Sequence, residues 1–133
     1  IFKNGNTTNF QLLSFAGALQ SLSFDMGNSL AYRELVGGTK EVLLTDRAAS
    51  GSVTIEAPTI AQKDFFAAAL TDTTLGNLQV THGTAAGNIC KFSSTKVDIG
   101  DISYGEMDGV NMLEIPYTLV PSTANDELTF LYT

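Results

Sequence analysis

Short segments in which apolar and polar residues alternate are the feature that most constrains the fold of this chain. In residues 19–26, Leu22, Phe24 and Met26 occupy one face and polar residues occupy the other, and residues 53–57 repeat the pattern. A period of two with one apolar face is typical of half-buried β-strands. Turn-forming residues interrupt the alternation about every ten residues, a spacing that favours a sandwich or a barrel of short strands.

The remaining strand signals follow at similar intervals. Residues 112–119 alternate from Leu113 to Leu119, and Pro116 falls on the opposite face. Because proline cannot donate to a ladder, this stretch is expected to be an edge strand or to be bulged there. Further strands are expected in residues 30–36, 42–44, 78–81, 88–92, 96–99 and 128–132, with turns over residues 46–51 and between residues 99 and 112.

One helix is expected, over residues 60–71. Thr59 can cap its N-terminus, and Gln62 completes a capping-box pattern three residues later. Phe66 and Leu70 stand four residues apart, in a run rich in alanine that would pack on a sheet. The fold class predicted is therefore mainly β, a β-sandwich or barrel-like fold with one flanking α-helix.

The length of 133 residues fits one domain. The first nine residues are polar and rich in Asn and Gly, and the chain begins at Ile1. Residues 1–16 are interpreted as a flexible start, or as a linker from an N-terminal part that precedes Ile1. Residues 17–133 are expected to form the single β domain.

Composition argues against several classes of function. The net charge is −7 with only two Arg and five Lys, so a basic patch for gripping nucleic acid is not available. Charged residues make up only 16% of the chain. The single cysteine, Cys90, excludes an internal disulfide, and folding in the cytoplasm is expected. No apolar run approaches the roughly 20 residues of a membrane-spanning helix, and no membrane partner is expected.

A catalytic centre is not expected. Nucleophilic catalysis needs a base beside the nucleophile, and the chain has one His and one Cys. His82 and Cys90 could meet across a hairpin, but no motif suggests a third, orienting residue. We interpret them as a turn histidine and a core cysteine, and we expect that the protein is not an enzyme.

No metal site or cofactor is expected either. One His and one Cys cannot make a common zinc site. The acidic residues near position 100 do not follow the spacing of a calcium-binding EF-hand loop, and we interpret them as solvated turn carboxylates. These residues are Asp98, Asp101, Glu106 and Asp108.

Two short segments are candidates for a contact between subunits. Arginine is favoured in interfaces because its planar guanidinium donates several hydrogen bonds, and both arginines stand beside acidic residues. The alternative for each segment is a local salt bridge or a turn cap. The candidate interface residues are Tyr32, Arg33, Glu34, Leu35, Asp46 and Arg47.

The succession of segments resembles the tail tube proteins of tailed bacteriophages and prophages. The resemblance runs from about residue 17 to the end of the chain and lies in the order of the segments rather than in one diagnostic motif. The segments that carry it are 21–28, 32–36, 44–48, 51–58, 63–66, 82–84, 87–88, 108–110, and Pro121 with 125–128.

The resemblance implies a two-sheet β-sandwich with one flanking helix, whose copies join into hexameric rings. Stacked rings would form a tube through which DNA passes without specific binding, and an acidic lumen suits such sliding. It also implies other tail proteins as partners: tape measure, baseplate or terminator, and possibly a sheath. The protein would then be located in the tail of the virion and be assembled in the cytoplasm of the bacterial host.

Three alternatives to a tube subunit stay open at the level of sequence. A connector or terminator would form a ring that does not stack indefinitely. A β-sandwich recognition module would bind a carbohydrate or a receptor through exposed aromatic residues such as Tyr32 and Tyr104. A small hydrolase would use a pair of carboxylates whose spacing in the fold decides the chemistry.

Overall fold

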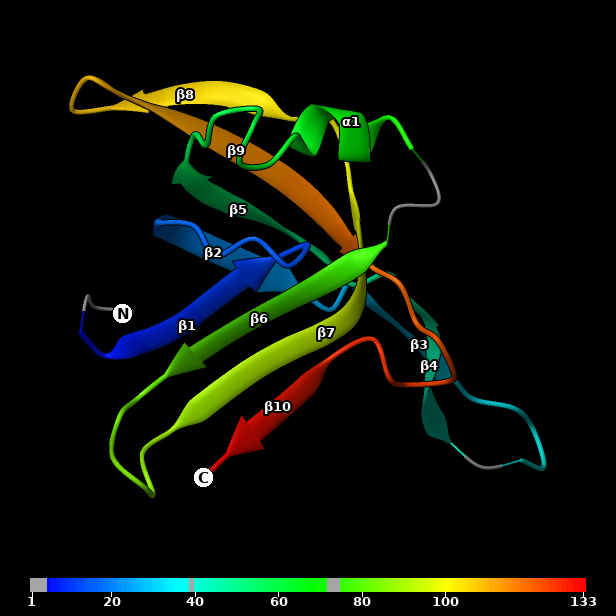
Figure 1. The fold of residues 1–133 in the computed structure, drawn as a ribbon. Coiled ribbons are helices and arrows are strands. Elements are labelled where there is room, and N and C mark those ends of the chain that lie inside the picture. Colours follow the sequence, from blue (N-terminus) through cyan, green and yellow to red (C-terminus); the bar gives the residue numbers. More distant parts are fainter. Residues whose placement is uncertain (1–4, 39, 72–74) are drawn as a thin grey trace.

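The computed structural model of the protein describes residues 5–38, 40–71 and 75–133 (Figure 1). These residues form ten strands and one short helix. In chain order they are β1 (Thr7–Leu12), β2 (Leu19–Asp25), β3 (Asn28–Arg33), β4 (Glu41–Arg47), β5 (Ser50–Glu56), α1 (Phe65–Ala69), β6 (Gly76–His82), β7 (Cys90–Ile99), β8 (Ser103–Met107), β9 (Val110–Leu119) and β10 (Thr129–Tyr132).

Eight of these strands belong to one sheet that folds into two facing halves. One half contains β1, β6, β7 and β10, and the other contains β2, β5, β9 and β8. The halves are joined where the end of β7 pairs with the end of β9, from Val97 with Leu119 to Ile99 with Tyr117. Figure 1 shows the two halves diverging from this corner. The mainly β, sandwich-like fold with one helix is thus confirmed.

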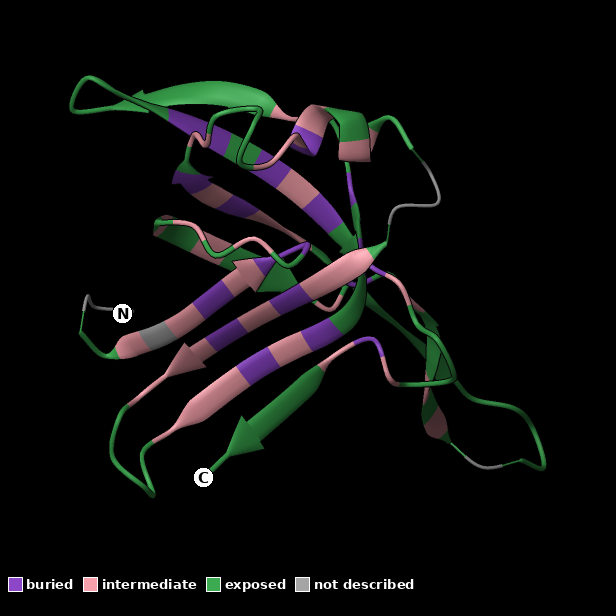
Figure 2. Cartoon of the chain, in the orientation of Figure 1, coloured by how far each residue is buried: buried purple, intermediate pink, exposed green. Residues whose placement is uncertain are grey.

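The core lies between the two halves. Alternate residues along the strands point inward, which gives the purple bands in Figure 2. In β9 the residues at every second position from Leu113 to Leu119 are buried, as the alternation predicts. Phe24 of β2 bridges the halves: its ring centroid lies 5.0 Å from that of Phe92 in β7 and 5.6 Å from that of Phe130 in β10. Such contacts are favourable for aromatic rings.

The start of the chain belongs to the sheet. Strand β1 pairs antiparallel with β6, and its Phe10 and Leu12 are buried in the core. The expected flexible start over residues 1–16 is therefore wrong for this strand. The polar Thr7 and Asn9 hide a period-two pattern whose apolar positions are Phe10 and Leu12. Residues 1–4 lie outside the described residues.

The helix is shorter than expected. It spans only residues 65–69, and its N-cap is Asp64, whose carboxylate accepts a hydrogen bond from Ala67 N at 2.9 Å. Thr59 and Gln62 do bond to each other, but they close a separate turn ahead of the helix. Phe65 is 1% exposed and packs edge-on against Phe15, so α1 covers one end of the core.

Two strands differ from the expected pattern in the second half of the chain. The two strands expected over residues 88–92 and 96–99 are one continuous strand, β7, which begins at Cys90 and runs through residues 93–95. Strand β8 lies in the region expected to be a turn, and all five of its residues are exposed. Because β8 buries neither face, its sequence has no alternation to reveal it. Only Asp108 and Gly109 remain as the turn before β9.

Pro116 sits in a central strand, but at a place where no ladder donor is needed. It faces Ser52 of β5. On its other side β9 changes partner: its pairing with β8 stops at Glu114, opposite Ser103, and its pairing with β7 starts at Tyr117, opposite Ile99. The carbonyl of Pro116 accepts a hydrogen bond from Gly100 N at 2.9 Å on that open side. The edge character expected for Pro116 is therefore local rather than a property of the whole strand.

Candidate subunit interface

Strands β3 and β4 form a separate two-stranded sheet that projects from the sandwich, at the lower right of Figure 1. We call residues 28–38 and 40–47 the arm and the rest of the described chain the body. The arm continues the β2–β5 hairpin beyond a bend at Gly27. Gly27 has a φ of +58°, and a Cβ there would lie 2.4 Å from the carbonyl oxygen of Ala48. The bend therefore requires glycine.

One face of the arm is apolar and open to solvent. In the ladder, Leu30 pairs with Leu44 and Tyr32 pairs with Val42, so these four side chains point to the same side. Their exposed fractions are 69%, 52%, 63% and 64% respectively. We call them the apolar face of the arm. Figure 2 shows the arm almost entirely as exposed or partly exposed residues.

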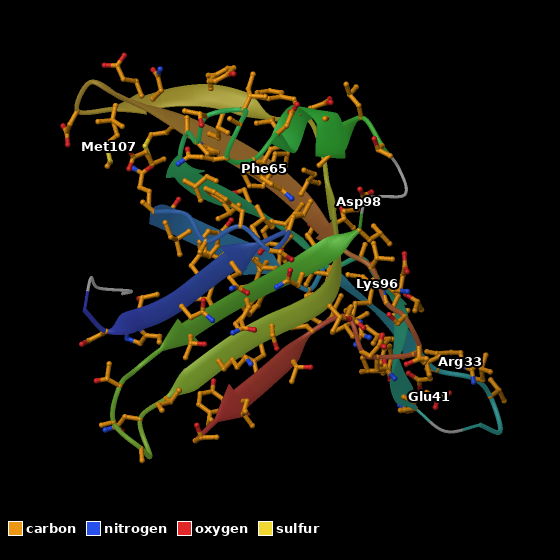
Figure 3. The ribbon with its side chains drawn as sticks, in the orientation of Figure 1. Arg33, Glu41, Phe65, Lys96, Asp98 and Met107 are labelled. Atoms are coloured by element: carbon orange, nitrogen blue, oxygen red, sulfur yellow. The ribbon has the colours of Figure 1, made fainter. Side chains whose placement is uncertain are left out.

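Charged side chains form ion pairs with one another near the tip of the arm. Arg33 and Glu41 form an ion pair at 2.7 Å across the two strands (Figure 3). Lys40 lies 2.6 Å from Glu34, which also accepts a hydrogen bond from the Tyr32 hydroxyl at 3.0 Å. Lys40, and after it Tyr32, hold the pKa of the Glu34 carboxyl below its usual value. These contacts all lie within the arm and are open to solvent, so each contributes little to stability.

The candidate residues fall into two groups. Tyr32 and Arg33 end β3, and Glu34 and Leu35 follow in the connection toward β4, so these four gather on the arm far from its root. Asp46 and Arg47 are the last residues of β4, at the root, where a turn was expected. The strand continues through them because they pair with Asn28 and Ser29. The role of all six in a subunit contact stays a prediction.

Arg47 turns toward the body. Its guanidinium pairs with Glu127 and donates a hydrogen bond to the side-chain oxygen of Asn125 at 2.8 Å. Asp46 accepts a hydrogen bond from the backbone N–H of Arg47 at 2.8 Å. Asp46 is thus a local cap, while Arg47 joins the arm to a segment that is distant in the sequence.

Sequence reasoning missed part of this site. Leu30, Val42 and Leu44 complete the apolar face, but a strand residue of this kind is ordinarily expected to face the core. Glu127 and Asn125 hold Arg47, and nothing in the sequence links them to it. The alternation of Leu30 with Tyr32 was the one signal for the apolar face, and it does not say which partner covers that face.

The structure brings His82 and Cys90 together as cross-strand partners of β6 and β7. The imidazole Nδ1 lies 3.3 Å from the hydroxyl oxygen of Thr7. Cys90 is partly buried. His82 is the last residue of β6, directly before the connection that begins at Gly83, as expected for a histidine at a strand end.

The described parts of the chain contain neither a metal-binding cluster nor a membrane-spanning helix. Within residues 5–38, 40–71 and 75–133, no three His, Cys, Asp or Glu side chains gather closely enough to hold a metal ion. In the same residues no helix has the length and apolar character needed to cross a membrane.

Comparison of the chain with known proteins shows a likeness in shape but none in sequence. No protein-family model matches the chain, and no curated protein matches it in sequence. A solved structure of the tail of an empty GTA particle, computed with helical refinement in C6 symmetry, contains a similar chain at 16% identity. The match covers 100% of this chain and 99% of that chain, with a TM-score of 0.49. At this identity and TM-score the likeness carries no argument about function.

Proposed function

We propose that this protein is a structural subunit of a phage or prophage tail, and in particular of the tail tube. Its copies join into rings, hexameric in the form the sequence resemblance implies, and the rings stack into a passive conduit for DNA. In this proposal the protein performs no chemistry and needs no cofactor. It acts in the tail of the virion after assembly in the bacterial cytoplasm, beside the tape measure, the baseplate or terminator and, in some tails, a sheath.

The apolar face of the arm is the observation that carries the proposal. An isolated two-stranded ribbon is at best marginally stable in water. This one exposes Leu30, Tyr32, Val42 and Leu44 together on one side. Contiguous exposed apolar side chains mark an interaction surface. A second copy is the partner proposed, because a ring subunit meets its own kind on both sides.

Free strand edges support the same proposal. Within the part of the chain that the structure describes, strand β10 pairs with β7 alone, and its four residues are all exposed. It carries no charge and no proline, which are the usual protections of an edge against pairing with another chain. A copy that pairs along this edge would extend the sheet from subunit to subunit.

The charge balance suits a conduit. With a net charge of −7 the protein repels the phosphate backbone rather than binding it. DNA would then slide through the lumen without being gripped. A lumen lined mainly by lysine would contradict this part of the proposal.

The first experiment is light scattering after size exclusion over a concentration series, with negative-stain imaging of any large species. Rings or tubes of sixfold symmetry are expected. The variant Leu30→Ser is expected to abolish them, whereas Ile60→Ser removes an equally exposed apolar side chain from the body and should leave them intact. A strict monomer at the highest concentration, or equal assembly by both variants, would contradict the proposal.

Two alternatives remain distinguishable by the same images or by a simple screen. A connector or terminator would give rings that do not stack. A recognition module is favoured by Tyr104, which is 71% exposed and stacks on Phe66 with ring centroids 5.4 Å apart. Binding of a glycan in an array, lost in Tyr104→Ala, would support that module over a tail subunit.

A further inference from the structure

The arm is held to the body by very few contacts. The backbone enters it at Gly27 and leaves it at Ala48, and among residues 5–38, 40–71 and 75–133 the arm strands pair with each other alone. The ion pairs of Arg33 with Glu41 and of Lys40 with Glu34 are internal to the arm. Among the described residues, Arg47 is the one arm side chain with a hydrogen bond or ion pair to the body.

The contact that Arg47 makes is largely buried. Glu127 is 5% exposed, and the side chain of Arg47 is 26% exposed. The second carboxylate oxygen of Glu127 is buried and has no hydrogen-bond partner among the residues that the structure describes. Leaving a buried carboxylate without its cationic partner is strongly destabilising, so the position of this side chain depends on Arg47.

Around this pair the junction is open rather than packed. A pocket of about 380 Å³ lies between the arm root and the segment 120–128, and Arg47, Asn125 and Glu127 line it. Side chains that interlock would fix the angle of the arm by contact, but an open pocket leaves that task to the ion pair.

The segment that carries Glu127 is itself held in shape. The carboxylate of Asp126 accepts hydrogen bonds from the backbone N–H groups of Ser122 and Thr123, at 2.7 and 3.0 Å, and from the Thr123 hydroxyl at 2.9 Å. The bond from the Thr123 N–H is the first cause of the lowered pKa of Asp126. Asn125 is held at a φ of +65°. Arg47 therefore meets two partners that are already in position.

We propose that Arg47, held by Glu127 and Asn125, is the positioning residue that sets the angle between the arm and the body. The role differs from the direct subunit contact expected for Arg47 from the sequence. It would present the apolar face in one orientation, and it holds in the isolated chain whether or not copies assemble.

The test measures the angle in the monomer. Nitroxide labels are placed on cysteines at Val36 in the arm and Thr95 in the body, with Cys90→Ser to remove the native thiol. Pulsed dipolar spectroscopy of a dilute sample then gives the distribution of distances between the labels. Val36 and Thr95 suit the labels because both are exposed and lie on opposite sides of the junction. One narrow peak is expected for the parent protein, because the contact of Arg47 would hold the arm at one angle.

Glu127→Gln is expected to broaden this peak at least twofold, or to shift it, with the circular dichroism of the body unchanged. This substitution removes the buried charged partner of Arg47, and the partly exposed guanidinium can then bind water instead. The matched control is Arg33→Gln, which breaks an ion pair inside the arm and should leave the peak as it is. If Glu127→Gln unfolds the chain, Asn125→Ala tests the same junction at an exposed position and should give a smaller broadening.

Equal distributions in the parent, Glu127→Gln and Asn125→Ala would overturn the proposal, because the angle would then be set by the backbone alone. A broad peak in the parent would overturn it as well. Neither result bears on tube formation, which the images of assembled protein decide separately.

Discussion

The body and the arm use the same kinds of apolar residue with opposite results. In the body, alternate residues of β5, β6, β7 and β9 are buried against the other half of the sheet. In the arm, no described residue is buried, although Leu30, Tyr32, Val42 and Leu44 form a continuous apolar face. Alternation therefore shows that a strand has a face to cover, but not whether the same chain covers it.

The largest expected effect on stability comes from replacing a leucine by alanine in the body, and the same replacement in the arm should have little effect. Leu78 in β6 is fully buried and Leu30 in the arm is 69% exposed. Leu78→Ala should lower the free energy of unfolding by about 2–5 kcal/mol, because it leaves a cavity. Leu30→Ala should change it by less than about 0.5 kcal/mol. Urea unfolding of the monomer, followed by circular dichroism, measures both, and equal losses would mean that the arm packs on the body.

A glycine in the body should be the next most sensitive position. Gly51 pairs with Tyr117 in the ladder, and a Cβ there would lie 2.1 Å from the carbonyl oxygen of Ser23 and 2.7 Å from the Tyr117 hydroxyl oxygen. Gly51→Ala should therefore destabilise the protein by about 1–3 kcal/mol through overpacking. Gly105→Ala is the matched control, since its nearest neighbour is Met112 Cβ at 3.9 Å. A neutral Gly51→Ala would show that Ser23 of β2 and Tyr117 of β9 can both move away from β5.

A smaller effect in the body depends on pH. The hydroxyl of Tyr117 donates a hydrogen bond to the carbonyl of Ser23 at 2.7 Å, and burial raises the pKa of this phenol. The unfolded phenol ionises near pH 10, so stability should fall as pH rises above about 10. Tyr117→Phe should lower the free energy of unfolding by about 0.5–1.5 kcal/mol at neutral pH. As pH rises into the alkaline range, the stability of this variant should fall less steeply than that of the parent protein. Thermal melting between neutral and alkaline pH compares the two, and parallel curves would contradict the prediction.

A charge reversal in the arm is expected to have a small effect on the stability of the monomer. Arg33→Glu replaces an exposed ion pair with two like charges and should change the free energy of unfolding by less than about 1 kcal/mol. Under the proposed function it should nevertheless weaken assembly. Lys96→Glu makes the same change of charge in the body and is the control. Assembly by Arg33→Glu that matches the parent in light scattering would remove this part of the arm from the interface.

How much of the fold the sequence predicts depends on burial. Strand β9 was predicted with its inward face because one face enters the core and the other does not. Strand β8 was missed because neither face is buried, and β1 because polar residues stand at its start. The helix was expected to be longer because its alanine-rich run favours helix, but Asp64 caps it only at Phe65.

The candidate site was predictable only in its local part. Tyr32, Arg33, Glu34 and Leu35 stand out as a group because they are neighbours in the sequence. The pairing of Arg47 with Glu127 was not predictable, since it depends on where the segment after β9 returns to the arm root. Contacts between distant segments leave no periodic signal in a single sequence.

The register at the base of the arm has a consequence for engineering and for divergence. Asp25 and Ser50 face each other as the last pair of the β2–β5 ladder, so the arm enters and leaves the body at adjacent points. A contiguous stretch of chain can therefore be exchanged for another hairpin, or for a tight turn, without rethreading any strand of the main sheet. The exposed surface of the arm can therefore change, by exchange of this one stretch, while the fold of the body stays the same.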